Sequence, residues 1–319
     1  MSVPHIDDIA IDRLLSLSSI YGAVNEALKD WGNGNAANTI RVRASAKGQM
    51  ASAMAAVAPP YSGGKVYATK DGVFTFLNVL FDDQGNLLCT LDGDVLTRLR
   101  TPVLCQIAIE KFAPENANKG AIIGAGRQGR LHLEMLIDSV KTLKSIKIYD
   151  PRKEAAQALV DIAQSRGVTA EIAATPSDAI KGAQVVVTLT PATEPLFEAD
   201  AVNEEALICA VGSTKYDKCE LPPKLMARAV SVVCDDVEGS KIECGDLIRA
   251  VDEGFFRWED AIEFKDVCAD KVRTPRANNS IVVFETQGLA LQDVAAAGVA
   301  WEKFKKEIRS EERRVGKEC

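Results

Sequence analysis

Histidine is nearly absent from this chain, which has only two in 319 residues. A histidine base is therefore almost excluded, and acid–base chemistry falls to lysine, aspartate, glutamate or bound water. The eight cysteines are scattered, without a C-x-x-C pair and without a histidine nearby in sequence. Zinc sites need clustered ligands and disulfide scaffolds are usually short. We therefore expect no metal, and free thiols that mostly fill the core, in a reducing cytoplasm.

Positive charge and long apolar runs are scarce as well. Acidic residues outnumber basic ones by 45 to 38, which gives a net charge of -7. Nucleic acid is not expected as the main partner, because phosphate binding needs a basic face. No run approaches the roughly 18 apolar residues of a membrane helix, and acids stand where a signal peptide would be basic. We therefore expect no membrane partner. At about 150 residues per domain, the chain length predicts two domains.

The front third of the chain has a mixed pattern of helix and strand. Apolar residues at helical spacing predict one amphipathic helix over residues 8–31. Strand-like segments fill residues 39–91, and the segment DDQGN between two of them predicts a hairpin. A further helix is expected over residues 94–112. This third therefore predicts an α+β domain.

From residue 114 the chain alternates strand and helix patterns up to residue 287. Such alternation is typical of βαβ units, and it predicts a Rossmann-type, doubly wound parallel sheet with helices on both faces. We expect the following helix to pack back on the front domain, which would then be discontinuous and comprise residues 1–113 plus 288–308. Residues 309–319 fit no element and resemble a translated vector end, so we interpret them as a non-native tail.

A glycine motif of the form G-x-G-x-x-G lies between an apolar strand and a helix. The glycines permit a tight turn, approach of a pyrophosphate and close packing of helix on strand, and the helix N-terminus favours phosphate charge. This context predicts a dinucleotide site, although a glycine turn without a ligand is the alternative. The motif comprises Gly124, Gly126, Arg127, Gln128 and Gly129.

Asp150 ends the second strand of this domain, about 20 residues after the glycine motif, where an acid can bind the adenosine ribose. Its charge favours NAD over NADP. Arg152 and Lys153 follow at once and could pair with a 2′-phosphate, so NADP stays possible. Asp150 could also be a helix cap.

An enzyme that uses a nicotinamide coenzyme needs a substrate anchor and a proton donor beside the path of the hydride. The front domain offers four candidate cations for these roles: Arg41, Arg43, Lys65 and Arg100. The planar fork of arginine suits a substrate carboxylate. A buried lysine near other cations can have its pKa lowered toward neutrality, as an acid–base group requires. Any single arginine or lysine is more often a solvated surface group, and nothing in the spacing brings these residues together.

Read in order, these segments resemble the ornithine cyclodeaminase/mu-crystallin family over residues 9–305. The most specific segment is LLCTLDGDVLTRLRT at residues 87–101, followed by the glycine motif at the family's distance. Further matching segments are TLTPATEPLF, CAVGSTKYDKCELPPKLM, ECGDL and FETQGLALQDVAAA.

The resemblance implies a Rossmann domain and an α+β domain that binds substrate and forms a homodimer. It implies hydride exchange with NAD(P) at the α-carbon of a small imino or amino acid. By position, Arg43, Lys65 and Arg100 would hold the substrate carboxylate, and Lys65 would also be the catalytic proton donor or relay. The residues that would line the nicotinamide are Thr188, Thr190, Val211, Gly212 and Ser213.

One departure from the family pattern shifts the expected reaction. Cyclodeaminase and alanine dehydrogenase members carry an aspartate where this chain has Thr214, and Asp217 would need a loop rearrangement to replace it. We therefore expect a reductase of imino or ketimine acids, such as Δ1-pyrroline-2-carboxylate or Δ1-piperideine-2-carboxylate, that forms L-amino acids. The alternatives are an ornithine cyclodeaminase, an amino-acid dehydrogenase, or a non-catalytic binding protein like mu-crystallin.

Overall fold

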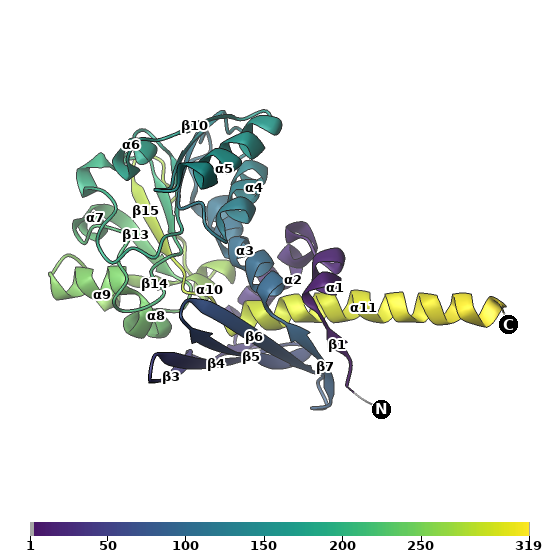
Figure 1. The fold of residues 1–319 in the computed structure, drawn as a ribbon. Coiled ribbons are helices and arrows are strands. Elements are labelled where there is room, and N and C mark those ends of the chain that lie inside the picture. Colours follow the sequence, from purple (N-terminus) through teal and green to yellow (C-terminus); the bar gives the residue numbers. More distant parts are fainter. Residues whose placement is uncertain (1–2, 319) are drawn as a thin grey trace. The chain divides into compact units, whose positions relative to one another are not determined.

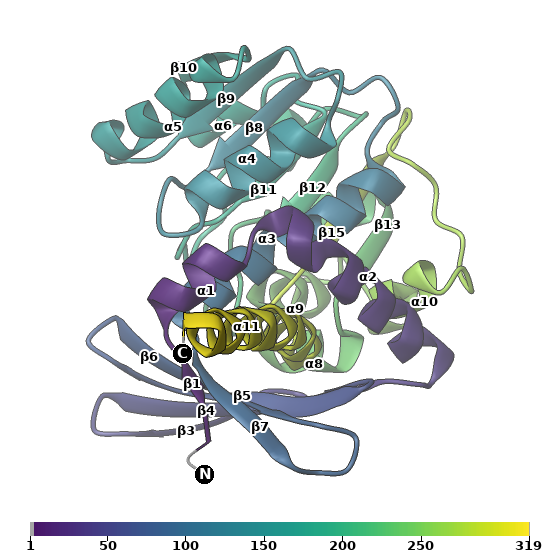
Figure 2. The ribbon, with the colours of Figure 1, turned by 90° about the vertical axis from the view of Figure 1, so that its right-hand side faces the viewer.

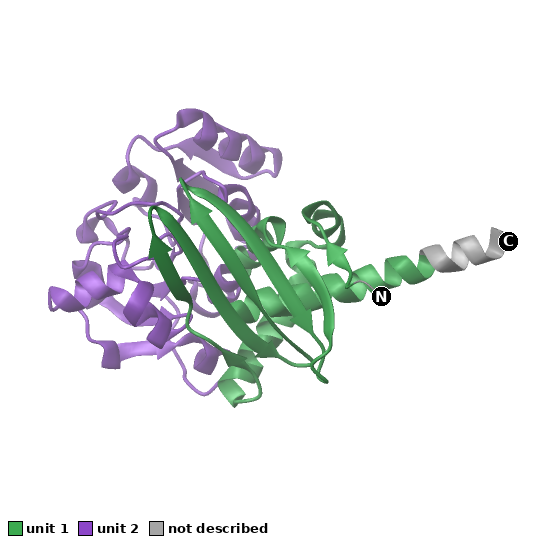
Figure 3. Ribbon diagram, turned by 60° about the horizontal axis from the view of Figure 1, so that its bottom comes forward, with its two compact units in different colours: residues 1–103, 289–319 green, residues 104–288 purple. Residues whose placement is uncertain are grey.

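The computed structural model describes residues 3–318, with side chains over residues 3–310, as two compact units. Unit 1 comprises residues 1–103 and 289–319, and unit 2 comprises residues 104–288 (Figure 3). The division falls inside helix α3 (Asp94–Phe112), whereas the sequence texture placed it after residue 113. The sequence pattern changes to alternating strands and helices just before the first strand of unit 2. The helix that precedes this strand already belongs partly to unit 2.

Unit 1 is built on a seven-stranded sheet in the part of the chain that the structure describes. The strand order is β1-β7-β6-β5-β4-β2, with β3 paired to β4, and neighbours from β2 to β7 are antiparallel. The predicted hairpin joins β6 and β7. The strands are β1 (His5–Ile6), β2 (Ala37–Asn38), β3 (Val42–Ala46), β4 (Gln49–Ala58), β5 (Tyr61–Lys70), β6 (Val73–Phe81) and β7 (Leu87–Asp92).

The predicted helix over residues 8–31 is two helices, α1 (Asp8–Leu14) and α2 (Leu17–Asn33). Ser16 separates them because its side chain accepts a hydrogen bond from the Ser19 backbone, while the Ser19 hydroxyl accepts one from the Ser16 backbone. This capping box starts a new helix. The expectation of a single helix was therefore wrong.

The two faces of the unit 1 sheet differ. Along β4 and β5 side chains alternate between buried and exposed, as expected for a sheet covered on one side. Helix α11 (Ala290–Glu318) packs against β4, β5 and β6 and covers the inner face. The outer face is broad and carries no helix of unit 1 (Figure 3). It exposes apolar side chains, among them Val42, Val57, Val66 and Leu77.

Helix α11 also corrects the expectation for residues 309–319. The backbone stays helical to Glu318, so these residues do belong to an element. Cys319 lies outside the described residues, and the non-native origin of the segment stays a prediction.

Unit 2 contains a doubly wound sheet of eight parallel strands within the described residues, in the order β10-β9-β8-β11-β12-β15-β13-β14. The expected Rossmann-type fold is confirmed. The strands are β8 (Lys119–Ile123), β9 (Ser145–Tyr149), β10 (Thr169–Ile172), β11 (Val185–Thr188), β12 (Leu207–Ala210), β13 (Ala229–Cys234), β14 (Ala261–Glu263) and β15 (Ile281–Glu285).

Helices cover both faces of this sheet, with α4 and α5 on one side and α6 and α7 on the other (Figures 1 and 2). Strands β11, β12 and β15 are buried along their whole length because neither face meets water, and their residues are apolar except for Thr188 and Glu285 at the strand ends. The helices are α4 (Gly129–Ser139), α5 (Lys153–Ser165), α6 (Pro176–Ile180), α7 (Lys224–Arg228), α8 (Val237–Glu243), α9 (Gly245–Asp252) and α10 (Phe264–Cys268).

Seven cysteines in the described residues are free and buried, so the expected free thiols in the core are confirmed there. None of the helices within the described residues is both long and apolar enough to cross a membrane.

Candidate active site

Lys65 lies at the centre of β5, on the inner face of the unit 1 sheet. It stands opposite Met54 on β4 and Asn78 on β6, and its side chain is only 2% exposed. Its ammonium lies 5.6 Å from the centre of the Phe76 ring. A lysine is rarely buried so fully unless a partner compensates its charge.

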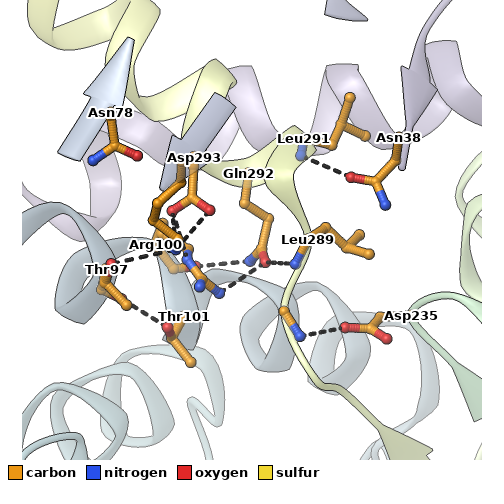
Figure 4. A network of polar contacts seen from close by, with 12 residues as sticks. Asn38, Asn78, Thr97, Arg100, Thr101, Asp235, Leu289, Leu291, Gln292 and Asp293 are labelled. Carbon is orange, nitrogen blue, oxygen red and sulfur yellow. Dashed lines mark hydrogen bonds and ion pairs between the residues drawn. The ribbon is translucent and has the colours of Figure 1, made fainter. Parts of the chain in front are cut away.

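The partner is Asp293, near the start of α11 (Figure 4). Lys65 Nζ lies 2.9 Å from Asp293 Oδ1 and 2.8 Å from Oδ2. Arg100, on α3, donates from Nε to the same Oδ1 at 3.1 Å. One buried carboxylate therefore holds two cations that come from a strand and a helix.

Gln292 fixes the arginine from the other side. Arg100 Nη1 donates to Gln292 Oε1 at 3.1 Å, and Gln292 Nε2 donates to the Arg100 carbonyl at 3.0 Å. The same Oε1 accepts the Leu289 backbone N–H, which ties the start of α11 to α3. With its rotamer fixed by these contacts, the guanidinium is positioned before any ligand arrives.

Burial dominates the electrostatics of this group. Burial lowers the pKa of Lys65 to about 7; the charges of Arg100 and Arg41 act in the same direction, and Asp293 opposes them. Burial alone would raise the pKa of Asp293, but the Arg100 and Lys65 charges hold it below its usual value. Two arginines and one aspartate therefore act on the pKa of Lys65, and the same aspartate holds both Lys65 and Arg100.

The two arginines near β3 differ in their relation to Lys65. Arg43 stands opposite Ser52 on the inner face, one row away from Lys65. The register carried one residue beyond Val42 brings Arg41 opposite Met54, in the row of Lys65, and its charge acts on the lysine. The structure thus brings Lys65 and Arg100 together as expected. Of the two arginines near β3, Arg41 is the one whose charge acts on the pKa of Lys65, whereas the resemblance favours Arg43.

Asp293 and Gln292 were not predicted. The available signal was a single acid within the apolar stretch ALQDVAAAGVA of the last helix. An acid on the apolar face of a helix needs a buried partner.

The glycine turn of unit 2 fits a dinucleotide. Gly124 follows β8 with φ +106°, and a Cβ there would lie 2.9 Å from the Leu189 carbonyl oxygen. At Gly129, the start of α4, a Cβ would lie 3.2 Å from Leu159. Gly126 is exposed, and a Cβ there would meet only Arg152, at 3.8 Å, so its backbone is open to a ligand. The turn therefore has the close packing and the open approach that a pyrophosphate requires.

Asp150 follows β9 beside this turn. Its carboxylate accepts hydrogen bonds from the Ala125 backbone at 2.7 Å, from the Arg152 backbone at 2.9 Å and from the Arg152 guanidinium at 3.0 and 3.1 Å. Burial raises its pKa, but these hydrogen bonds outweigh burial and lower it. Arg127 is exposed, and Gln128 precedes α4 without a side-chain capping bond.

The residues predicted beside the nicotinamide follow β11 and β12. Thr188 is fully buried and its hydroxyl donates to Glu220, as does that of Thr190. Val211 and Ser213 are buried, and Gly212 lies between them with its backbone N–H on Glu220. Glu220 was missed by the sequence reading.

The loop after β12 contains the departure from the family pattern. Thr214 donates its backbone N–H to the Gly212 carbonyl, and Asp217 is exposed to solvent. Within the described residues no cluster of histidine, cysteine, aspartate and glutamate has the arrangement of a metal site.

The parallel sheet and the glycine turn together define a Rossmann-type dinucleotide-binding fold. The chain belongs to the ornithine cyclodeaminase/mu-crystallin family, whose model matches residues 5–307. The resemblance read from the sequence is confirmed.

Similar proteins of this family have several activities. A Δ1-pyrroline-2-carboxylate reductase of Bacillus cereus is 32% identical over 221 residues, 69% of this chain and 67% of the reductase. The structure of a probable ornithine cyclodeaminase from Bordetella pertussis is 32% identical, with a TM-score of 0.90 over 96% of this chain and 98% of the other. An archaeal alanine dehydrogenase dimer with bound NAD is 28% identical, with a TM-score of 0.91 over 96% of this chain and 97% of the other.

Proposed function

We propose that this protein is a reductase of imino acids that uses NADH or NADPH and forms L-amino acids. The observation that carries the proposal is the buried group around Lys65, in which Lys65 and Arg100 share the carboxylate of Asp293 and the charge of Arg41 also acts on the lysine. Two buried cations that share a single carboxylate favour an anionic substrate, and a substrate carboxylate matches the fork of an arginine.

The substrate carboxylate binds Arg100 together with Arg41 or Arg43. Gln292 and Asp293 hold the Arg100 guanidinium in place, so the carboxylate meets a preorganised partner. A fixed carboxylate in turn fixes the C=N carbon to which it is attached. Positioning of this kind lowers the barrier because the reactants lose their freedom on binding rather than in the transition state.

Lys65 supplies the proton. A pKa of about 7 leaves a large fraction of the ammonium protonated at neutral pH, and it also makes the ammonium a good donor. The proton goes to the imine nitrogen, which makes the C=N carbon more electrophilic. The product nitrogen keeps this proton, and the carbon gains a hydride.

Unit 2 would hold the coenzyme, which in its reduced form would supply that hydride. Gly124, Gly126 and Gly129 admit the pyrophosphate at the start of α4, and Asp150 lies where the adenosine ribose binds. The archaeal dehydrogenase with bound NAD supports NAD as the coenzyme of this chain. NADP is the alternative coenzyme, because Arg152 could pair with its 2′-phosphate.

Thr214 favours reduction over the other activities of the family. A threonine cannot act as a carboxylate base, and Asp217 is exposed rather than turned into a buried site. The probable cyclodeaminase and the alanine dehydrogenase among the similar structures keep both activities as alternatives. A binding protein without catalysis has no need for the cation group around Lys65.

The test follows reduced-nicotinamide absorbance with NADH and with NADPH. The substrates are Δ1-pyrroline-2-carboxylate, Δ1-piperideine-2-carboxylate, and 2-oxo acids with ammonia or methylamine, while L-ornithine with NAD is assayed for ammonia. Oxidation with a cyclic imine and no ammonia from ornithine is the expected result. Ammonia and proline from ornithine without net coenzyme change would establish the cyclodeaminase instead. No reaction in any assay would leave the binding protein.

The outer face of the unit 1 sheet supports a homodimer. Its exposed apolar residues border a shallow depression of about 720 Å³ lined by residues of β3 to β6. Exposed apolar surface of this kind marks an interaction site. Light scattering is expected to give twice the chain mass.

The buried free thiols support a reducing compartment such as the cytoplasm.

A further inference from the structure

Glu220 is a fully buried carboxylate in unit 2 that lies in the segment after β12. Its Oε1 accepts hydrogen bonds from the Thr190 backbone N–H at 2.6 Å and from the Thr190 hydroxyl at 2.8 Å. Its Oε2 accepts from the Gly212 backbone N–H at 2.7 Å and from the Thr188 hydroxyl at 2.8 Å. Each oxygen thus takes two short hydrogen bonds, which is the full capacity of an ionised carboxylate.

These donors come from two separate loops. Thr188 and Thr190 belong to the end of β11 and the loop after it, and Gly212 belongs to the loop after β12. One side chain therefore ties the carboxyl ends of two adjacent parallel strands. Gly212 has to be glycine here, because a Cβ would lie 2.5 Å from the Glu220 carboxyl carbon and 2.2 Å from the Thr190 carbonyl oxygen.

A second carboxylate holds Glu220 itself. Asp246, at the start of α9, accepts the backbone N–H groups of Glu220 at 2.6 Å and Leu221 at 2.9 Å. The Asp246 backbone N–H donates to the Ser213 hydroxyl, which donates to the Lys218 carbonyl. Asp246 thus fixes the backbone that carries the Glu220 side chain. Through Ser213 it also holds the loop after β12.

The strand order indicates which half of a dinucleotide these loops meet. The glycine turn follows β8, and Asp150 follows β9 on one side of it. The neighbours of β8 on the other side are β11 and then β12. A dinucleotide with its pyrophosphate at β8 and its adenosine ribose at Asp150 extends toward β11 and β12 with its nicotinamide half.

We propose that Glu220 is a positioning residue for the nicotinamide half of the coenzyme, acting through Thr190 and Gly212 without touching the coenzyme itself. This inference rests on the proposed coenzyme site. It extends that proposal to the second half of the coenzyme. Asp150 would bind the adenosine ribose, whereas Glu220 would fix the loops that contact the nicotinamide half.

The substitution Glu220→Gln tests the proposal in the full-length protein. The amide nitrogen cannot accept hydrogen bonds, so one of the two pairs of donors loses its acceptor. Binding of NADH is compared by titration calorimetry with binding of ADP-ribose, which has the whole coenzyme except the nicotinamide. We expect NADH to bind roughly 10-fold or more weakly to the variant, with ADP-ribose affinity kept within about 2-fold.

Glu285→Gln is the matched control. Glu285 is a fully buried carboxylate of the same unit, at the end of β15, and within the described residues it interacts with the Cys244 thiol but accepts no N–H or O–H hydrogen bond. This control is expected to leave the ratio of the two affinities unchanged. Thr188→Val, which removes one of the four donors, is expected to weaken NADH selectively but less, and it replaces Glu220→Gln if that variant does not fold.

Two results would overturn the inference: equal weakening of both ligands, which indicates a general loss of structure, or unchanged NADH binding. If the unmodified protein binds neither NADH nor ADP-ribose, the proposed coenzyme site is wrong, and this inference is wrong with it. The outcomes of the wild-type and variant titrations thus keep the two proposals distinguishable.

Discussion

Each unit buries a group of charged side chains, and the two groups are of opposite sign. In unit 1, Lys65 and Arg100 share the carboxylate of Asp293. In unit 2, Glu220 and Asp246 are neighbours, with Glu285 also in the network of interacting carboxyls. Burial lowers the pKa of Lys65 to about 7 and raises that of Glu220 to about 7, although their ordinary values lie far apart. Burial therefore shifts the pKa values of both groups toward 7, because desolvation disfavours the charged form of each: it lowers the pKa of the lysine and raises that of the glutamate.

The difference lies in what compensates the charge. Four donors of the protein itself fill the acceptor sites of Glu220, two of them backbone N–H groups. Lys65 and Arg100 in unit 1 have one carboxylate between them, that of Asp293. A saturated charged group holds structure together, whereas an unsaturated one is available for a ligand. Substitutions in either group test this difference.

The largest effect is expected for Lys65→Met, which removes the proposed proton donor and keeps an apolar chain of similar length. Turnover of the imino acid should fall by about 100- to 10,000-fold, the usual contribution of a general acid. NADH affinity should be unchanged in calorimetry. Lys70→Met, an exposed lysine on the same strand, is the control and should retain full turnover. Unchanged turnover of Lys65→Met would remove this residue from the mechanism.

A smaller effect should separate the two arginines near β3. Arg41→Gln is expected to raise the KM for the imino acid by about 10- to 100-fold, because a charge-assisted hydrogen bond to the carboxylate is lost. Arg43→Gln is expected to change KM by less than about 3-fold, since its row on the sheet is not that of Lys65. Steady-state kinetics of both variants decide the assignment, and the reverse order would restore the arginine chosen from sequence.

The pH profile tests the balance of charge around Lys65. Its pKa is lowered to about 7, and the acid is active when protonated, so kcat/KM should fall as the pH rises through 7. Asp293 opposes that lowering. In Asp293→Asn the fall should therefore begin at a lower pH than in the wild type. Asp83→Asn, an exposed acid of unit 1, serves as the control. A profile that does not move, or moves upward, would contradict the proposed role of Asp293.

The smallest effect is expected for Glu285→Gln in unit 2. Burial raises the pKa of Glu285 well above its usual value, so replacing this carboxyl by a neutral amide should change the Tm little at the acidic end of the pH range. A carboxyl whose pKa is raised on folding contributes stability below its unfolded pKa and loses it as the pH rises through the folded pKa. The variant should therefore become the more stable form at high pH. Thermal unfolding from pH 6 to 9 measures the difference, and a variant that is much less stable at pH 6 would show that Glu285 is ionised there.

The parts of the molecule that follow from local pattern were predictable. The glycine turn needs only a strand before it and a helix after it, and both are recorded in adjacent residues. The break at Ser16 was missed because serine, rather than glutamate, completes the capping box. Arg41 and Arg43 were hard to separate because alternation puts both on one face of the sheet, and only the register against β4 distinguishes them.

Buried partnerships over long sequence distances were out of reach. Lys65 and Asp293 lie 228 residues apart, and nothing in either segment names the other. Glu220 is an ordinary acid in the sequence, and its four donors come from loops that only the parallel sheet brings together. The family resemblance pointed to Lys65 and Arg100 because both lie at positions that match the family's segments. The residues that support them emerge from the packing.

The bare outer face of the unit 1 sheet has a further consequence. If two copies join through it, the folded chain is stabilised by its own concentration, since association favours the native state by mass action. Dilution would then act as a mild denaturant. A single charged side chain at Val66, the middle of that face, would make the melting temperature independent of concentration.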